Sequence, residues 1–247
     1  MEKWNTGIQA LFDDDSSIWS TDPTLRLLHY VICHHHQSLS KEHFDRILLG
    51  RKLDVSEYQY STLESLKEHV EMSCGSLLYL VLECANIHQH NQENEPIYDA
   101  AKHIGITHGL ANSLRLSVPK ASSTGKIIIP QDLCEKYGVR SPRYLLSALG
   151  MGDEECKTHL QHAVRDIVQE ARIHLKEGRM YMNEIKNLSN GDDALSTFLP
   201  ALASETFLDR LERHEYQLTD RKLRNVGYSE HMSCVTKITK ASFRKVY

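Results

Sequence analysis

The chain has 247 residues, of which 40% are hydrophobic and 25% charged, the profile of an ordinary globular protein. Its net charge is −4 and it has no basic stripe interleaved with aromatic residues, so nucleic-acid binding is not expected. Glycine and proline are sparse, at 12 and 6 residues, which favours long helices over many short strands.

The first 17 residues, MEKWNTGIQALFDDDSS, carry four acids and resemble neither a secretory signal nor an acid-poor transit peptide. We therefore expect no presequence in this chain. Asp13 to Asp15 are adjacent instead of one helical turn apart, which favours a loop or a helix end over a metal site. Asp22 and Pro23 then predict a helix start, an N-cap acid followed by proline, for a helix over 24–36.

Two further helices are predicted next. Ser40 begins one over 41–49 that Gly50 is expected to end. Thr62 caps the strongest helix, which runs to about residue 88. The longest apolar run, LLYLVLECANI, lies in it and is broken by Glu83, so it falls short of the roughly 18 residues of a membrane span. Its expected apolar stripe is Leu63, Leu66, Val70, Leu77, Leu78 and Val81.

A helix beginning at Glu95-Pro96 is expected to end at Pro119, because proline cannot continue the hydrogen-bond ladder. A polar loop follows, and then three isoleucines that favour an extended piece with no obvious partner, ahead of a short helix. Ser141-Pro142 predicts another helix start. The long helix after it should bury a stripe formed by Cys156, Leu160, Ala163, Val164, Ile167, Val168, Ala171 and Leu175.

The last part of the chain contains a clear loop over 187–193 and a helical segment over 195–216, in which Pro200 is a kink or a new first turn. The tail from Arg221 is basic. No internal repeat is present. Long helices in one chain predict a single domain over 1–247, an all-α helical bundle.

The segment 112–131, NSLRLSVPKASSTGKIIIPQ, belongs to a stretch between Asp99 and Asp132 that contains no acid at all. Its basic residues are Arg115, Lys120 and Lys126. Two interpretations are open: a basic site for an anion, or a site without the acids that catalysis would need.

Other patterns are compatible with metal binding or catalysis, but for each of them a purely structural role is favoured. His29, Cys33 and the run 34–36 have a spacing that could bind zinc, yet adjacent histidines point in different directions around a helix. Cys84 and Cys134 could be nucleophiles, but no neighbouring base is evident. The six cysteines include no C-x-x-C pair and are typical of reduced thiols in an intracellular protein.

Glu64, Glu68 and Glu71 stand at i, i+4 and i+7 and could share a Mg²⁺ ion, but a solvated helix face that includes Lys67 is favoured. No G-x-S-x-G, phosphate-binding glycine loop, dinucleotide fingerprint or H-E-x-x-H is present. The acid-free stretch remains as the informative feature.

The segment 103–139, HIGITHGLANSLRLSVPKASSTGKIIIPQDLCEKYGV, resembles the second signature of squalene and phytoene synthases. Gly105, Asn112, Arg115, Lys126 and Pro130 stand at the matching places. STLESLKEHVEMSCGSLLYLVLE resembles the preceding helix of that family, and FLPALASETFLDRLERHEY resembles its last characteristic segment. The resemblance covers roughly 61–216 and implies the helical bundle of isoprenoid synthases.

The resemblance implies a mechanism for the enzymes of this family: two aspartate-rich motifs bind Mg²⁺ ions, which stabilise the departing diphosphate. Leu116 and a position near Lys120 stand where the aspartates of the second motif would be, and neither can bind Mg²⁺. The amino-terminal residues match a part of the family that follows the first motif. We therefore expect the chain to be amino-terminally truncated, without the first helices of the bundle.

The acid-free stretch, SLLYLVLE, AAKHIG and SFRKVY resemble a non-catalytic branch of the family that serves in assembly of mitochondrial respiratory complex I. This resemblance implies a mitochondrial protein on the matrix side of the inner membrane. Its partners would be early complex I subunits or other assembly factors, and peripheral membrane association is left open. It implies no catalytic residues, no metal and no cofactor.

Two alternatives are kept. The first is a module that binds an isoprenoid or phosphorylated lipid, with Asn112, Arg115, Lys120 and Lys126 around the head group. Against it stands the possibility that Arg115 pairs with a helix acid while Lys126 is solvated. The second is an active prenyl-diphosphate transferase, which would need Glu64, Glu68 and Glu71 as substitute metal ligands.

Overall fold

The structure is a computed structural model that describes residues 2–34, 39–89, 91–140, 142–143, 154–224 and 228–244. Within these residues every regular element is a helix, apart from one isolated β-bridge, so the predicted all-α class is confirmed. None of the helices in this part of the chain combines the length and the apolarity that crossing a bilayer requires.

The helices differ widely in length, from single turns to 29 residues in α7. In chain order they are α1 (Glu2–Phe12), α2 (Ser16–Trp19), α3 (Pro23–His34), α4 (Lys41–Ser56), α5 (Leu63–Val70), the π-helix η1 (Glu71–Gly75), α6 (Ser76–Cys84), the 3₁₀-helix η2 (Gln92–Asn94), α7 (Glu95–Ser123), α8 (Gln131–Tyr137), α10 (Glu154–Met180), α11 (Met182–Ile185), α12 (Gly191–Thr197), α13 (Pro200–Arg213), α14 (Arg221–Arg224) and α15 (Tyr228–Arg244).

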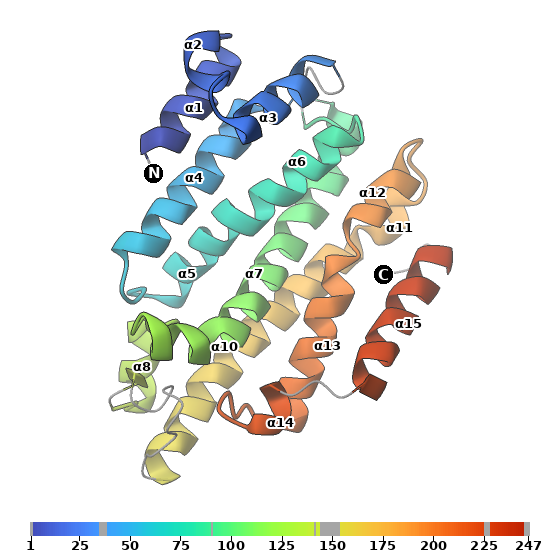
Figure 1. Cartoon of the computed structure of the whole chain (residues 1–247). Coiled ribbons are helices and arrows are strands. Elements are labelled where there is room, and N and C mark those ends of the chain that lie inside the picture. Colours follow the sequence, from blue (N-terminus) through green and yellow to red (C-terminus); the bar gives the residue numbers. More distant parts are fainter. Residues whose placement is uncertain are drawn as a thin grey trace.

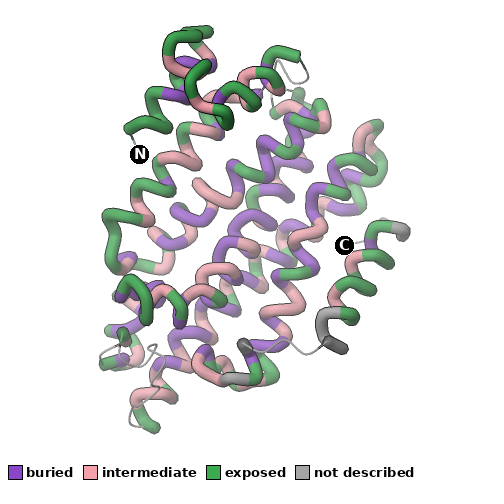
Figure 2. The backbone as a smooth tube through the Cα atoms, viewed as in Figure 1, coloured by how far each residue is buried: buried purple, intermediate pink, exposed green. Residues whose placement is uncertain are grey.

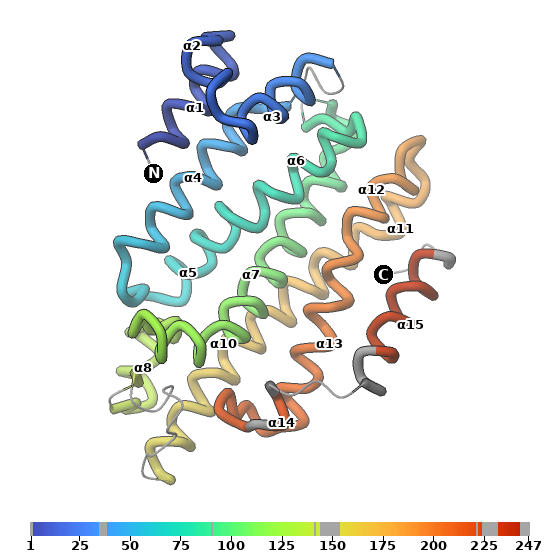
Figure 3. Tube along the Cα trace, in the orientation of Figure 1, coloured from blue at the N-terminus to red at the C-terminus, as the bar shows by residue number. Residues whose placement is uncertain are grey.

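The long helices α7 and α10 pack against each other in opposite directions at the centre of the bundle (Figure 1). The continuous rod of α5, η1 and α6 packs on one side of α7, and α4 lies outside that rod. On the other side α13 packs on α7 and is itself covered by α15 (Figure 3). The first and last helices, α1 and α15, therefore lie on opposite flanks of the bundle.

Burial follows this arrangement, since buried residues gather on the central helices (Figure 2). The predicted stripe of α10 is correct: Leu160, Ala163, Val164, Ile167, Val168, Ala171 and Leu175 are all buried, and Cys156 packs at the edge. One apolar cluster surrounds the carboxyl-terminal half of α7, and a second surrounds its amino-terminal half together with α6, α11 and α12.

Several predicted helix boundaries are confirmed. Asp22 accepts hydrogen bonds from the main-chain nitrogens at the start of α3, Thr62 forms a capping box with Ser65, and Pro200 opens α13 as a new first turn. The triplet Asp13 to Asp15 lies after the end of α1, as expected for a helix end. Of the helix start predicted at Ser141-Pro142, only residues 142–143 are described, and both are helical; residues 141, 144–149 and 35–36 lie outside the described residues.

Three boundaries were predicted wrongly. Gly50 does not end α4, which continues to Ser56, because a glycine inside a helix costs only about 1 kcal/mol and this one is buried beside Ser73. The helix predicted over 62–88 is interrupted by η1. Pro119 lies inside α7. It removes the donor to the Arg115 carbonyl, but Arg115 and Pro119 are exposed, so water can replace the missing hydrogen bond.

The three isoleucines do have a partner. The segment 127–132 runs alongside residues 58–61, with one parallel bridge between Gln59 and Ile127. We call this pairing the clasp. It consists of the bonds Ile127 N to Tyr58 O (3.0 Å), Gln59 Nε2 to Ile129 O (2.8 Å), Gln131 N to Tyr60 O (2.9 Å) and Asp132 N to Ser61 O (3.0 Å).

Candidate functional site

A cleft lies where the end of α4, the α5–η1 rod and α7 meet. It contains about 470 Å³ of empty space, part of it open to solvent. Its polar lining includes Arg51, Asp54, His69, Asn112 and Lys120. The acid-free stretch of α7 therefore faces residues that come from two other helices.

Asp54 is the centre of the charged network in this cleft. Its Oδ1 atom lies 3.2 Å from Lys126 Nζ, 3.6 Å from Lys120 Nζ and 3.4 Å from His69 Nε2. Burial alone would raise the pKa of the Asp54 carboxyl. The hydrogen bonds from His69 and Lys126 and the charge of Lys120 outweigh it, so this pKa lies well below its ordinary value.

Lys126 is buried, with 6% of its surface exposed, which excludes the expectation that it is solvated. Its ammonium also donates to the main-chain oxygen of Asp54 at 3.2 Å and lies 5.1 Å from the centre of the Tyr60 ring. The clasp holds it there, because residue 126 directly precedes the paired isoleucines. Burial and the nearby Asp54 carboxylate raise the pKa of Tyr60, which keeps its hydroxyl neutral.

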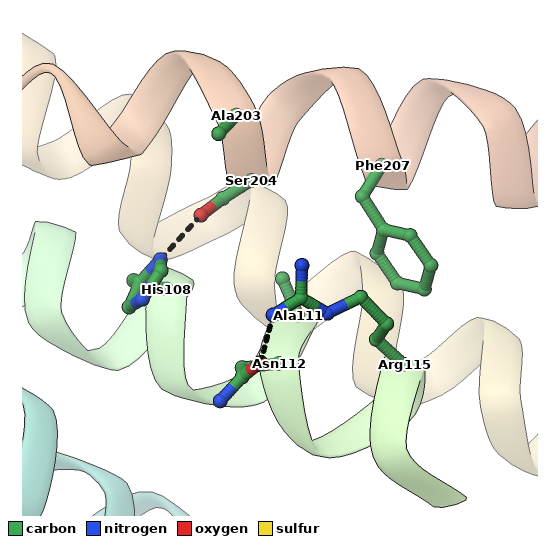
Figure 4. A pocket seen from close by; sticks show the side chains of 7 residues that line it. All are labelled: His108, Ala111, Asn112, Arg115, Ala203, Ser204 and Phe207. Atoms are coloured by element: carbon green, nitrogen blue, oxygen red, sulfur yellow. Dashed lines mark hydrogen bonds between the residues drawn. The ribbon is translucent and has the colours of Figure 1, made fainter. Parts of the chain in front are cut away.

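Arg115 occupies a different place from the other predicted residues. It donates to the side-chain oxygen of Asn112 at 2.6 Å, and no acid partner is found for it among the described residues, contrary to the helix-acid pairing considered above. Figure 4 shows it in a small pocket between α7 and α13, close to Phe207. In the same pocket His108 is 3.0 Å from the Ser204 hydroxyl, and burial lowers the pKa of His108.

The four predicted residues are divided between two neighbouring sites that share Asn112. Asn112 lines both the cleft and the pocket on the α13 side, where Arg115 donates to it, while Lys120 lines the cleft and Lys126 lies beside Asp54. Leu116, which stands at a position expected of an aspartate, lines the cleft together with Lys120.

The fixed charges of the cleft favour an anion over a metal ion. Arg51, Lys120 and Lys126 carry three positive charges against the single carboxylate of Asp54, and Arg51 also lies 3.2 Å from that carboxylate. A divalent cation would need several free oxygen ligands, whereas the one carboxylate here is already held by cations. A phosphate group could be bound through the excess of positive charge.

Sequence reasoning missed Asp54, His69 and Arg51. A usable signal existed, because a lysine that directly precedes three isoleucines is expected to be buried and so requires a nearby acid. The acid-free stretch offers none, so the partner had to come from another segment. The clasp determines which segment supplies this acid, and local sequence patterns do not reveal the clasp.

The other sequence candidates remain separate from this cleft. Glu64 pairs with Lys67 at 2.7 Å, Glu71 pairs with Arg46 at 3.2 Å, and Glu68 is exposed, so these acids do not converge on one ion. His29 stacks on Trp19 and lies 3.1 Å from Asp14. Cys134 is buried, and burial raises the pKa of its thiol to about 11.

The profile of the squalene/phytoene synthase family matches residues 1–228, and the chain belongs to this family. A solved dehydrosqualene synthase in complex with a ligand superposes with a TM-score of 0.69 at 20% identity, covering 97% of this chain and 77% of that one. The squalene synthase HpnC of Alicyclobacillus acidocaldarius superposes at 0.64 and 17% identity, over 86% and 72% of the two chains. These likenesses establish the isoprenoid-synthase helical fold.

The curated relatives are named as an assembly factor and not as synthases. "NADH dehydrogenase (ubiquinone) complex I, assembly factor 6" of Mus musculus is 24% identical over 218 residues, which is 88% of this chain and 59% of the relative. Its Drosophila melanogaster homolog is 27% identical over 239 residues, 96% of this chain and 62% of the relative. The chain thus spans about three-fifths of the length of these relatives.

Proposed function

We propose that this chain acts in the assembly of mitochondrial respiratory complex I, on a squalene/phytoene synthase fold that does not carry out prenyl transfer. The observation that carries the proposal is the lining of the cleft. The cleft is lined by Leu116 and Lys120, which by the resemblance stand at and near the places of the enzymes' aspartates, and Asp54 is neutralised by lysines. The names of the curated relatives support the same role.

The proposed place of action is the matrix side of the inner membrane, in peripheral association with it. The proposed partners are early complex I subunits or other assembly factors. A tagged complete chain expressed in mitochondria should enrich these subunits over a tagged matrix protein of similar size. Depletion should lower the amount of mature complex I on native gels. Complex I of normal abundance after depletion would overturn the assembly role.

A separate assay tests the absence of catalysis. The chain is incubated with farnesyl or geranylgeranyl diphosphate and Mg²⁺, next to a bacterial dehydrosqualene synthase as a positive control. We expect no prenyl product and no released diphosphate. Turnover by this chain would contradict the non-catalytic part of the proposal. Because the assembly role is read from complex I abundance, the two parts can fail independently.

A second candidate, compatible with the first, is the binding of a phosphorylated or isoprenoid ligand. It is favoured by the excess positive charge of Arg51 and Lys120 in the cleft. Calorimetry with inorganic pyrophosphate and with farnesyl diphosphate separates the head group from the apolar tail. Lys120→Met should weaken binding of both by at least about tenfold. Lys136→Met, which removes a lysine that pairs with Asp166 on α10, should leave binding unchanged.

A further inference from the structure

A cluster of two histidines and a glutamate lies on the partly exposed edge of the α7–α10 interface. His103 is on α7, and His174 and Glu177 are on α10. The helices approach closely here because Gly178 has no side chain: a Cβ atom on it would lie 3.3 Å from the Cβ of His103. Thr107, one turn further along α7, donates to the main-chain oxygen of Ala171 at 3.1 Å, which fixes the same register.

Three potential ligand atoms converge in this cluster. Nδ1 of His103 lies 2.8 Å from Nδ1 of His174 and 3.0 Å from Oε2 of Glu177, and Nδ1 of His174 lies 3.5 Å from the same oxygen. A single proton on His103 can bridge only one pair well, and it leaves the lone pair of His174 facing a carboxylate. A cation between the three atoms would satisfy all of them at once.

The separations suit a transition-metal ion. Three atoms this far apart can all lie about 2.1 Å from one point, the length of a zinc–imidazole bond. The side chains are 21%, 13% and 38% exposed in the order His103, His174 and Glu177, so further positions on an ion would be open to water. Two imidazoles and one carboxylate with open positions are the ligand set of many Zn²⁺ and Fe²⁺ sites.

Groups around the cluster support a ligand role for His174. Its Nε2 atom is buried and lies 3.5 Å from Oε1 of Glu170, and Lys67 holds that carboxylate at 2.7 Å. An acid behind the second ring nitrogen is the usual way to orient a metal-binding histidine.

The geometry points to a binding site for one divalent transition-metal ion, of the Zn²⁺ or Fe²⁺ kind, held by Nδ1 of His103, Nδ1 of His174 and a carboxylate oxygen of Glu177. Nothing in the cleft around Asp54 contributes to it. The site therefore stands independently of the proposed assembly role, and of whether the cleft binds an anion.

The test is a Zn²⁺ titration of the full chain against a chromogenic chelator, with Co²⁺ absorption as a second readout. The three histidines at 34–36 could bind metal by themselves. Every protein used in this titration, including the reference, therefore carries glutamine at these three positions. We expect one equivalent of Zn²⁺ with Kd below about 10 μM. His103→Ala with His174→Ala should weaken binding at least about 100-fold, and Glu170→Gln about tenfold.

Two controls keep the result interpretable. His162→Gln changes another histidine of α10, one that contacts the Tyr137 ring, and should leave the affinity unchanged. Glu177→Gln retains the shape of the side chain but loses the anionic ligand, so it tests the site where the double alanine variant fails to fold. The site is wrong if Zn²⁺ shows no saturable binding, or if binding survives in the double variant or in folded Glu177→Gln. The two rings would then form only a metal-free hydrogen bond.

Discussion

The buried Lys126 and the half-buried Asp54 form an ion pair between segments that are 72 residues apart in the chain, with Nζ 3.2 Å from both Oδ1 and the main-chain oxygen of Asp54. The pair joins the end of α4 to the start of the clasp. The same carboxylate faces Lys120 across the cleft. One acid therefore determines both the charge of the cleft and the attachment of the segment after α7.

Asp54→Asn should destabilise the fold strongly, because it leaves the buried Lys126 ammonium without a counter-charge. The expected loss in the free energy of unfolding is about 2–4 kcal/mol, measured by urea denaturation. Asp45→Asn serves as the control, since it breaks an exposed pair with Lys41 on the same helix and should cost less than about 0.5 kcal/mol. Equal stability of the two variants would contradict the role of Asp54.

The stability contributed by Asp54 should depend on pH in the acid range. Its pKa is lowered in the folded chain, whereas the unfolded value is near 3.9. Below about pH 4 the unfolded chain takes up a proton that the folded chain does not, so the contribution is complete above this pH and is lost as the pH falls. Between pH 5 and 3 the stability difference between wild type and Asp54→Asn should shrink by about 1 kcal/mol. A constant difference would contradict the lowered pKa.

Gly105→Ala should destabilise the bundle by about 1–3 kcal/mol in chemical denaturation. The added Cβ would lie 2.7 Å from the Cα atom of Gly75, a backbone contact that no side-chain rotation can relieve. Gly50→Ala is the matched control, because it too lies inside a helix but its Cβ would meet Ser73 at 3.4 Å. Gly50→Ala should raise the free energy of unfolding by about 0.5–1 kcal/mol, because alanine has the higher helix propensity. If both substitutions destabilise the fold, the packing argument for Gly105 is wrong.

Thiol reactivity should separate Cys134 from the exposed cysteines. Burial raises the pKa of Cys134 to about 11, so only about one thiol in a thousand is ionised at pH 8. Cys33 and Cys84 are exposed and should react first with a maleimide, as followed by mass spectrometry of peptides. All six should react in denaturant. Labelling of Cys134 at the rate of Cys33 in the folded chain would show that it is accessible and activated.

Helix periodicity predicted the stripe of α10 correctly but failed in the rod of α5, η1 and α6. Val70 and Leu78 are buried as expected, but after η1 the predicted Leu77 and Val81 are 57% and 43% exposed, and the buried Leu82 was not predicted. The wide turn of a π-helix holds an extra residue, and one residue rotates the following helix by about 100°. A regular 3.6-residue count through η1 therefore selects the wrong face.

The candidate site, too, could be predicted from the sequence only in part. The acid-free stretch is visible in the sequence and does contribute Asn112, Leu116 and Lys120 to the cleft. Asp54 lies on a different helix, and its position relative to Lys126 depends on tertiary pairing that no local pattern encodes. Arg115 lies one turn beyond Asn112 and shares the pocket on the α13 side with it, so Asn112 connects this pocket to the cleft.

The clasp also has a mechanical consequence. Its two segments run in parallel, so tension on the two ends of the chain pulls them past each other along their length. In this shear geometry the load is shared by all the clasp hydrogen bonds instead of opening them one at a time. The bonds join residues about 70 positions apart and enclose α5, η1, α6, η2 and α7. Single-molecule pulling should therefore show these five elements extending together, after one force peak.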